Sequence, residues 1–265
     1  MNKLYPESLR RAHNLALWLG NPERDLVVLA EGNVSQRADD AASTFWLKSS
    51  GCSMESMNSD QFVLMDTALT LDLLKSGELH DTEIKHLLHQ ARDSRSVDLY
   101  PSTEAVLHAI CLTEGNADAV GHTHPTPWLS ILCAEWAEDA TAGRLFPDEI
   151  VVCGPGSCFV EYHDPGLPLA RACRDAIRDY KEKWGDSPKL ILLQNHGIFV
   201  LGSDAEEVKR VTTMAVKVAR VLLGTFAVGG PNFLSNGHVS RIHTRPDESH
   251  RKRMLAEYAF LDIAK

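Results

Sequence analysis

Hydrophobic and polar residues follow helix and strand spacing along most of the chain. Apolar residues three or four positions apart share one face of a helix, and they predict helices over residues 6–19, 67–76, 82–92, 102–113, 125–135, 167–184 and 203–223. Short apolar runs bounded by Gly, Pro, Asn or Ser predict buried strands over residues 26–29, 44–48, 62–65, 117–120, 150–153, 159–162, 190–193 and 198–201. Helices and strands are therefore expected to be mixed along the whole chain.

Three short polar segments stand next to these predicted elements. Residues 31–35 and 49–51 follow predicted strands, and residues 102–103 begin a predicted helix. Such turns offer small polar side chains and exposed backbone N–H groups, which can hold an anion without a lysine or arginine. Taken singly, each is better explained as a turn or a helix cap. Together they make candidate anion ligands of Gly32, Asn33, Ser50, Gly51, Ser102 and Thr103.

The character of the chain changes near its C-terminal end. A Gly-Gly-Pro-Asn segment begins at Gly229, a polar stretch follows, and a charged helix is expected over residues 247–261. No internal repeat or low-complexity segment is present. We therefore expect one large domain over residues 1–228 and an appendage of loop and helix over residues 229–265.

Composition and charge narrow the classes of function. The chain has 265 residues, of which 44% are hydrophobic and 24% charged, enough for a sizeable globular core. Its net charge of -9 disfavours binding to nucleic acid or to anionic membranes. Six cysteines without a CxxC pair, the lack of an apolar signal core near the N-terminus and the lack of a transmembrane-length apolar run predict a cytoplasmic protein.

Two histidines follow the predicted strand over residues 117–120. Side chains on a strand alternate between its faces, so His122 and His124 are expected to point the same way, and His196 follows a similar apolar run. If these strands are neighbours, the three imidazoles form a site with an open fourth position, which is the catalytic form of zinc coordination. Taken alone, His196 is also compatible with a loop histidine bonded to backbone.

One acidic residue is placed to join this site. Glu104 lies near the start of a predicted helix, where it could act as metal ligand, as general base, or as both in turn. A carboxylate in this position also stabilises the helix dipole, which is a purely structural role. His108 lies one helical turn later on the same face, where it could support the site or belong to the core or to an interface.

The order and separation of these motifs carry a family resemblance. Gly32-Asn33-Val34-Ser35, Ser49-Ser50-Gly51, Ser102-Thr103-Glu104 with His108, His122-Thr123-His124 and Gln194-Asn195-His196-Gly197 occur in this order. The chain resembles the class II aldolase/adducin family over residues 8–223. Each motif is short, but five of them in register are specific.

The resemblance implies a fold, an assembly and a set of ligands. It implies an α/β fold with three α/β/α layers, a central, mostly antiparallel sheet, and a homotetramer with sites at the subunit interfaces. The residues that match the family's metal ligands are His122, His124 and His196, which implies a divalent metal, most commonly Zn²⁺, with Mn²⁺ as the alternative. Glu104 matches the acid that completes the metal shell and acts as acid and base. The matching phosphate ligands are Gly32, Asn33, Ser50, Gly51, Ser102 and Thr103.

The implied function is that of a zinc-dependent class II aldolase. It would cleave a ketose phosphate or a related sugar acid in a reversible retro-aldol reaction, through an enediolate that the metal stabilises. Epimerase, dehydratase and decarboxylase reactions can use the same metal site, so they stay open. A non-catalytic adducin-like module is disfavoured, because such members lack the histidines and this chain keeps all three together with Glu104.

Two departures from the family pattern bear on the reaction. Fuculose-1-phosphate aldolases contribute a tyrosine from a neighbouring subunit, whereas the corresponding residues 146–150 contain none here. Asp148 or Glu149 is the candidate to replace it. Glu31, directly before the first phosphate-type turn, is unfavourable beside a dianion, which raises the alternative of a substrate without a phosphate.

Overall fold

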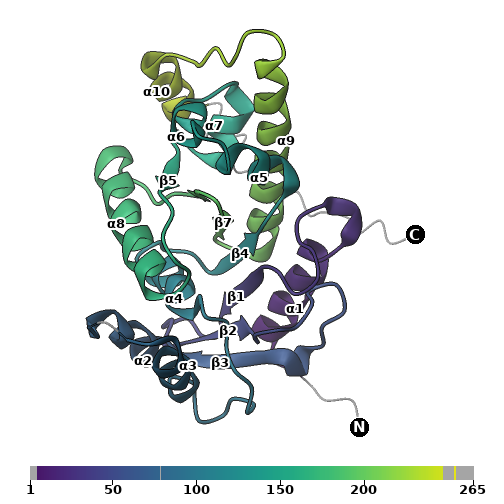
Figure 1. Cartoon of the computed structure of the whole chain (residues 1–265), viewed down its shortest axis with the longest axis vertical. Coiled ribbons are helices and arrows are strands. Elements are labelled where there is room, and N and C mark those ends of the chain that lie inside the picture. The colour runs from purple at the N-terminus through teal and green to yellow at the C-terminus, as the bar shows by residue number, and fades with distance from the viewer. Residues whose placement is uncertain (1–4, 78, 247–253, 255–265) are drawn as a thin grey trace.

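The computed structural model describes residues 5–77, 79–246 and 254, and within them the strands form a single sheet of seven (Figure 1). The strand order is β3-β2-β1-β4-β7-β6-β5, and every neighbouring pair is antiparallel except β5 and β6. The strands are β1 (Asn33–Arg37), β2 (Thr44–Lys48), β3 (Phe62–Asp66), β4 (Ala119–Thr123), β5 (Cys158–Val160), β6 (Leu190–Leu193) and β7 (Gly197–Gly202). The expected mostly antiparallel sheet is confirmed.

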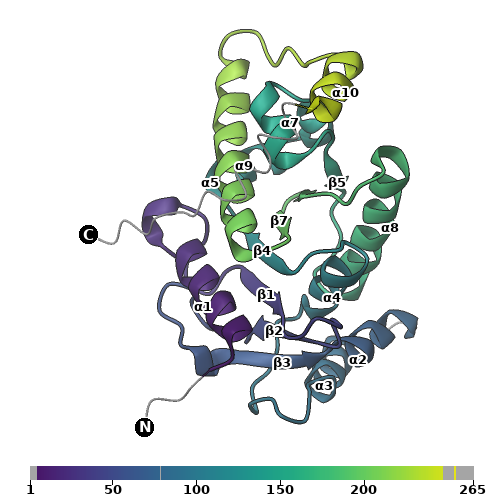
Figure 2. The ribbon, with the colours of Figure 1, turned by 180° about the vertical axis from the view of Figure 1, so that it is seen from behind.

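Helices cover both faces of this sheet (Figures 1 and 2). The α-helices are α1 (Glu7–Leu19), α2 (Thr67–Asp72), α3 (Asp81–Gln90), α4 (Ala105–Thr113), α5 (Thr126–Leu132), α6 (Ala137–Thr141), α7 (Pro147–Cys153), α8 (Leu167–Trp184), α9 (Ala205–Phe226) and α10 (Asn236–Thr244). Short 3-10 turns lie at η1 (Pro22–Arg24), η2 (Ser59–Gln61) and η3 (Leu73–Lys75).

Two apolar clusters, one on each face, form the core. The first packs α1, α5 and α9 against the sheet, and the second packs α4 and α8 against the opposite face. Strand β6 shows the division clearly, because Leu190 and Leu192 belong to the first cluster while Ile191 and Leu193 belong to the second. This alternation is what a strand covered on both faces requires. The three-layer α/β/α architecture expected from the sequence is therefore confirmed.

The first strand of the sheet lies where a polar turn was predicted. Residues 33–37 form β1 at the centre of the sheet, and residues 26–29, predicted as a strand, form an irregular loop instead. Asn33, Ser35 and Gln36 are polar yet buried. A search for apolar runs does not find such a strand, and it mistakes the neighbouring Leu26–Leu29 for one. Leu29, 84% exposed with a φ of 57°, does not fit a buried strand.

Two further predictions of secondary structure were wrong. Residues 150–153, predicted as a strand, are the end of α7, which begins at Pro147 with two acids in its first turn. Proline and acids at that place favour a helix start, and they outweigh the apolar run. Helix α10 occupies part of the stretch after Gly229 that was expected to be a loop. The charged helix predicted over residues 247–261 lies outside the described residues, apart from Met254.

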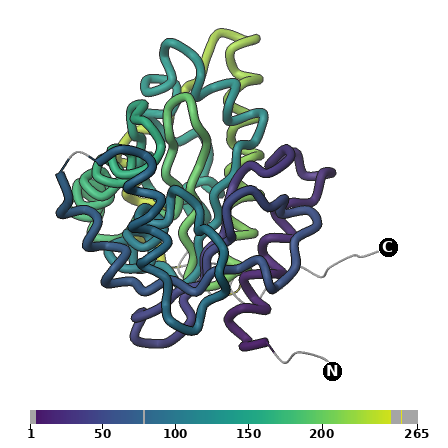
Figure 3. Tube along the Cα trace, turned by 60° about the horizontal axis from the view of Figure 1, so that its bottom comes forward, coloured from purple at the N-terminus to yellow at the C-terminus, as the bar shows by residue number. Residues whose placement is uncertain are grey.

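The segment after Gly229 packs back on the main fold. Helix α10 lies against α7, and Leu234 donates a backbone hydrogen bond to Arg144. The ring of Phe233 fills the space where Gly143 has no side chain, since a Cβ there would lie 2.3 Å from the ring. The division of the chain at residue 229 stays a prediction. In the trace of Figure 3, the purple and blue N-terminal segments run through the lower and middle parts of the view, and teal and yellow-green segments reach its top.

No helix among the residues that the structure describes combines the length and apolar character needed to cross a membrane.

Candidate metal centre and active site

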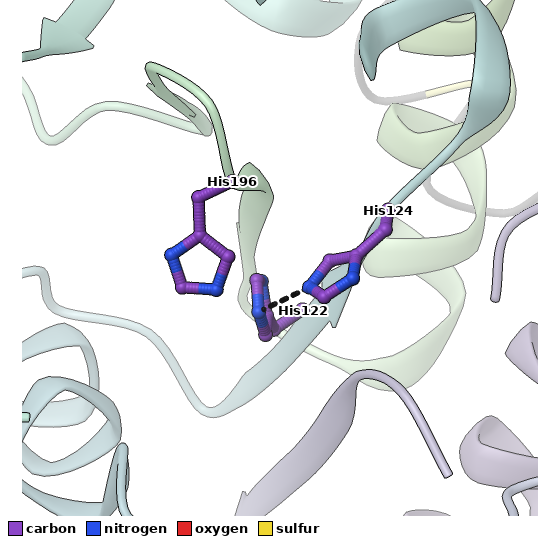
Figure 4. A group of neighbouring side chains, drawn as sticks. All are labelled: His122, His124 and His196. Atoms are coloured by element: carbon purple, nitrogen blue, oxygen red, sulfur yellow. Dashed lines mark hydrogen bonds between the residues drawn. The ribbon is translucent and has the colours of Figure 1, made fainter. Parts of the chain in front are cut away.

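The three histidines meet at the centre of the sheet. His122 lies on β4, His124 directly follows that strand, and His196 lies in the turn between β6 and β7. Strands β4 and β7 are antiparallel neighbours in which His122 pairs with Phe199, so the turn before β7 lies beside the end of β4. One nitrogen of each ring lies within 4.8 Å of the others (Figure 4). The expected juxtaposition of the three imidazoles is therefore present.

The orientation of His122 is fixed by the neighbouring strand. Its Nδ1 lies 2.9 Å from the carbonyl oxygen of Ile198, which can only accept a hydrogen bond, so Nδ1 carries the proton. Its ring stacks on Phe199 with the centroids 4.1 Å apart. Burial lowers the pKa of His122 well below its ordinary value, and the imidazoles of His124 and His196 lower it further. A neutral ring with Nδ1 protonated directs a lone pair from Nε2 toward the cluster.

His124 is positioned by contacts with the loop that precedes β1. Its Nδ1 lies 3.7 Å from a carboxylate oxygen of Glu31, and its backbone N–H donates to the carbonyl of Leu26 at 2.8 Å. Gly197 lies against the ring, since a Cβ there would be 2.6 Å from His124 Cδ2. Burial lowers the pKa of His124, although Glu31 opposes the shift. Its Nε2 points into the cluster toward His122 Nε2.

This donor set fits a divalent cation. The Nε2 atoms of His122 and His124 lie 3.0 Å apart (Figure 4). Two nitrogens each ~2.0–2.1 Å from one tetrahedral zinc would be about 3.3 Å apart. His122 Nε2 can only accept, so this contact is a hydrogen bond that His124 Nε2 donates, and a bound cation would take the place of the shared proton. Burial also lowers the pKa of His196, with Glu104 opposing, so the third ring favours the neutral form that binds metals.

Glu104 closes the cluster from the start of α4. Its Oε2 lies 3.3 Å from His122 Nε2, and its Oε1 lies 3.4 Å from His196 Nε2 and accepts no hydrogen bond. The side chain is 8% exposed, and burial raises the pKa of the carboxyl group against the opposing effects of His196, Asn33 and Lys48. Glu104 is the N-cap residue of α4, whereas the sequence placed it in the first turn of a helix that begins at Ser102 or Thr103. Its carboxyl group can thus hold a proton beside the cluster.

A chain of buried hydrogen bonds holds Glu104 in place. Asn33 donates from Nδ2 to Glu104 Oε2 at 2.7 Å and to Ser102 Oγ at 3.1 Å. Its Oδ1 accepts from His108 Nε2, and His108 Nδ1 accepts from Ser35 Oγ at 2.6 Å. Burial lowers the pKa of His108 to about 3, so the ring stays neutral and keeps this direction of donors. Of the two roles left open for His108, support of the site is the one that these contacts favour.

The candidate anion ligands form two neighbouring turns. Ser49 pairs with Pro101 in an isolated bridge and Ser50 donates to the carbonyl of Tyr100, so the Ser50–Gly51 turn lies beside the segment that leads to Ser102 and Thr103. Gly51 has a φ of 79° and open space around it. Ser50, Gly51 and Thr103 are exposed, which suits a ligand-binding surface.

The other two candidates contribute differently. Gly32 has a φ of 67°, and a Cβ there would lie 2.5 Å from the carbonyl oxygen of His122, so glycine permits the close approach of β1 to β4. The amide of Asn33 is occupied by Glu104, Ser102 and His108. The side chain of Asn33 therefore positions the acid in this structure, and its role toward an anion stays a prediction.

Sequence reasoning missed one cation near the site. Lys48, the last residue of β2, is 3% exposed, and its Nζ donates to the carbonyl of Ala30 at 3.3 Å. Burial lowers its pKa, while the charges of Cys52 and Glu104 act in the opposite direction. The signal in the sequence was a single lysine at the end of an apolar strand, directly before Ser-Ser-Gly.

The two acids suggested as replacements for the family tyrosine lie on α7. Glu149 is 3% exposed, accepts a hydrogen bond from the backbone N–H of Leu145 at 2.7 Å and pairs with Arg144 at 3.3 Å. Its carboxylate is thus engaged in the start of its own helix and not in the histidine cluster of the same chain. Asp148 lies in the same first turn.

A comparison with known families decides the assignment. The family model described as "Class II Aldolase and Adducin N-terminal domain" matches residues 15–223, most of the chain and all of the site residues above. The chain belongs to the class II aldolase and adducin family. Members of this family generally depend on a divalent metal and bind small sugar-phosphate substrates, and the histidine cluster gives this member a place for the metal.

Two relatives are similar in sequence to part of this chain. A methylthioribulose-1-phosphate dehydratase of Geobacillus thermodenitrificans is 26% identical over 190 residues, which cover 71% of this chain and 78% of the relative. An uncharacterized oxidoreductase of Bacillus subtilis, YuxG, is 27% identical over 179 residues, 66% of this chain. The match spans only 23% of YuxG, about a quarter of its length.

Solved structures of the family share the fold. An L-fuculose 1-phosphate aldolase aligns with a TM-score of 0.67 at 17% identity, over 91% of this chain and 96% of its own. The N-terminal class II aldolase domain of a Thermoplasma acidophilum protein gives 0.62 at 22% identity, over 84% and 97%. The L-fuculose-1-phosphate aldolase of Thermus thermophilus gives 0.58 at 15% identity, over 84% and 98%. At these identities the similarity shows the fold alone.

Proposed function

We propose that this protein is a metal-dependent aldolase that cleaves a carbon–carbon bond of a ketose phosphate or a related sugar acid in a reversible retro-aldol reaction. The observation that carries the proposal is the position of one acid against the histidine cluster. Glu104 lies 3.3 Å from His122 Nε2 and 3.4 Å from His196 Nε2. Membership of the class II aldolase and adducin family supports the same chemistry.

The cation would be held by His122, His124 and His196 through their ring nitrogens, with Glu104 as a further ligand in the absence of substrate. Zn²⁺ is the proposed metal because it prefers nitrogen ligands in four-coordinate sites, and Mn²⁺ is the alternative. When bound, the cation would act as a Lewis acid that stabilises negative charge on the substrate oxygens.

Glu104 is proposed to carry the proton at the carbon next to the carbonyl group. In the cleavage the C3–C4 bond breaks, the C4 hydroxyl loses its proton, and the electron pair left at C3 takes up a proton. Burial raises the pKa of Glu104, so its carboxyl group holds a proton closer to neutral pH than an exposed acid does. Asn33 fixes Oε2, whereas Oε1 accepts no hydrogen bond and is free to deliver the proton.

The anionic end of the substrate is proposed to lie on the two neighbouring turns. The exposed residues Ser50, Gly51 and Thr103, together with Ser102, offer hydroxyl and backbone N–H groups. Asn33 and Gly32 complete the proposed set at the start of β1. The buried ammonium group of Lys48 adds a favourable positive charge beneath a site that faces the net charge of -9 of the whole chain.

The proposal includes a homotetramer in the cytoplasm. The group that takes the C4 hydroxyl proton is expected from a neighbouring subunit, since Glu149 is engaged inside its own subunit and no tyrosine lies at residues 146–150. All six cysteines are free thiols, as is usual in a reducing compartment.

A dehydratase is the second candidate function. It is favoured by the relative from Geobacillus thermodenitrificans, a methylthioribulose-1-phosphate dehydratase that is 26% identical to this chain. Dehydration beside a carbonyl also needs a proton moved at the neighbouring carbon, so the same carboxyl group of Glu104 would serve. Epimerase and decarboxylase reactions share these requirements but have no separate observation in their favour.

The metal is tested before the reaction. Purified protein is expected to hold about one divalent metal per subunit, measured by elemental analysis, and His122→Ala is expected to lose it. Glu135→Ala, a change at an exposed acid outside the site, is the control that keeps the metal. A native protein without metal, or full occupancy in His122→Ala, would contradict the proposed site.

The reaction is tested with a panel of ketose phosphates, sugar acids and keto acids. Separate assays follow dihydroxyacetone phosphate, pyruvate, carbon dioxide and dehydrated ketone products. Glu104→Gln is expected to lower kcat by about 10²–10⁴-fold while the histidines retain the metal. Turnover of Glu104→Gln at the wild-type rate would rule out the proton-transfer role, and a dehydrated product without cleavage would favour the dehydratase.

A further inference from the structure

The loop over residues 25–31 is fastened to the chain around His124 at three points. Asp25 accepts a hydrogen bond from the hydroxyl of Thr126 at 2.8 Å. The carbonyl of Leu26 accepts from the backbone N–H of His124 at 2.8 Å. The carboxylate of Glu31 lies 3.7 Å from Nδ1 of the same ring. This loop therefore borders His124, one of the three metal-ligand candidates.

The position of the Glu31 carboxylate is set by its own loop. Oε2 accepts the backbone N–H of Val28 at 2.9 Å, and the backbone N–H of Glu31 donates to the carbonyl of Val28 at 3.1 Å. These two bonds close a tight turn, which has Leu29 at a φ of 57° and is followed by Gly32 at a φ of 67°. The same oxygen that closes the turn also faces His124. The side chain of Glu31 is thus held toward the ring although it is 41% exposed.

The three rings differ in what faces their Nδ1 atoms. The Nδ1 of His122 faces a backbone carbonyl, that of Ile198, at 2.9 Å. The Nδ1 of His196 is buried and has no hydrogen-bond partner. Only His124, of the three, has a carboxylate at this place. A carboxylate beside an imidazole keeps the proton on the nitrogen that faces it and makes the opposite nitrogen, here Nε2, a stronger electron donor toward a metal.

We propose that Glu31 is a positioning residue for His124, which holds the ring with Nε2 toward the cluster and thereby strengthens the binding of the cation. The inference rests on the proposed metal site and adds a residue to it. It also changes the meaning of Glu31. In the sequence this acid stood as an unfavourable neighbour of a phosphate, whereas in the structure its carboxylate points to a histidine.

Metal affinity measures this role without reference to activity. The full-length protein is stripped of metal, and its Zn²⁺ and Co²⁺ dissociation constants are determined by competition with a chromogenic chelator. Glu31→Ala is expected to raise the dissociation constant about 10-fold, at the lower end of the 10–100-fold range for such partners of metal ligands, because Glu31 is partly exposed. The matched control is Glu135→Ala, which removes an exposed acid elsewhere and is expected to leave the constant unchanged.

A purely structural role of the loop is separated by a second variant. Glu31→Gln keeps an oxygen that can accept the N–H of Val28 but removes the negative charge from beside His124. It is expected to weaken metal binding while the metal-free protein keeps its thermal unfolding midpoint. Wild-type affinity in Glu31→Gln together with weak binding in Glu31→Ala would assign Glu31 to the turn alone and overturn the inference.

A double substitution tests whether the effect passes through His124. The dissociation constants of His124→Ala and of His124→Ala with Glu31→Ala are expected to agree, because the acid has no ring left to position. An equal loss in both backgrounds would overturn the inference and leave the metal site standing. A wild-type protein that binds neither Zn²⁺ nor Co²⁺ would instead overturn the proposed function and the inference with it.

Discussion

Single polar residues buried beside the histidines determine what Glu104 can do. The carboxyl group is held by Asn33, Asn33 is held by His108, and His108 is held by Ser35. Each member has its donors and acceptors matched, which is the condition under which buried polar groups stabilise one arrangement. Removal of any one leaves a buried group unpartnered, at a cost of about 1–3 kcal/mol. At this scale the acid owes its position to a chain of buried polar side chains.

The pH dependence of stability follows from His108. Its pKa in the folded protein is about 3 against an ordinary 6.5, so between these values the unfolded chain binds a proton that the folded chain does not. Stability from this residue is complete above pH 6.5 and is lost as the pH falls, by up to ~1.4 kcal/mol per pH unit. His108→Gln is therefore expected to flatten the slope of unfolding free energy between pH 6 and 4, measured by urea denaturation of metal-free protein. The exposed His86→Gln is the control, and an unchanged slope in His108→Gln would contradict the assignment.

The elements bring these residues together through a few close approaches. Strand β7 begins at Gly197 directly beside the end of β4, and strand β1 begins at Asn33, next to Gly32. At Gly197 the His124 ring and the Thr123 carbonyl fill the space that a side chain would need, and at Gly32 the His122 carbonyl and the side chains of Val27 and Met54 fill it. Glu104, the N-cap residue of α4, lies beside these strand ends, so the start of a helix and the ends of two strands meet at one place. The site is a property of strand ends and a helix start, not of one loop.

Gly197→Ala tests the close approach of β7 to His124. The added Cβ would lie 2.6 Å from both His124 Cδ2 and the carbonyl oxygen of Thr123, which is backbone and cannot move freely. The unfolding free energy is expected to fall by about 1–3 kcal/mol and metal affinity to fall with it. Gly224→Ala in α9 is the matched control, because its Cβ meets nothing within 4 Å and alanine favours a helix by about 1 kcal/mol. Equal stability of Gly197→Ala and wild type would contradict the packing described.

Across the whole molecule, the sequence predicted the architecture and the site better than it predicted the individual strands. The motif residues specify the family, and the family specifies the sheet and the grouping of His122 with His196. Strand β1 was not predicted, because its buried residues Asn33 and Ser35 are polar. They hydrogen-bond to Glu104 and His108, and a search for apolar runs does not detect such contacts. The run at 150–153 is too short for its period to separate strand from helix. The burial of Lys48 near the site and the contact of Glu31 with His124 arise from tertiary structure, so patterns in a single sequence do not predict them.

Metal binding is expected to stabilise the entire fold. A cation held by His122, His124 and His196 joins the end of β4 to the turn between β6 and β7. These segments are brought together only in the folded protein, so the unfolded chain lacks the site. At a free metal concentration 100 times the dissociation constant, the gain is about 2.7 kcal/mol, with a higher thermal unfolding midpoint. Calorimetry with and without a chelator measures it, and His122→Ala is expected to show no difference between the two conditions. An equal gain in that variant would place the metal elsewhere.

The strand order has a consequence for the protein while it is being synthesised. β4 pairs on one side with β1, which precedes it by many residues, and on the other with β7, which follows only after α8 and β6. The third imidazole, His196, is therefore synthesised 72 residues after His124. Until then the first two histidines have no third partner, and a nascent chain should take up little metal. Binding of the cation is then a late step, which occurs only after β6 and β7 have joined the sheet.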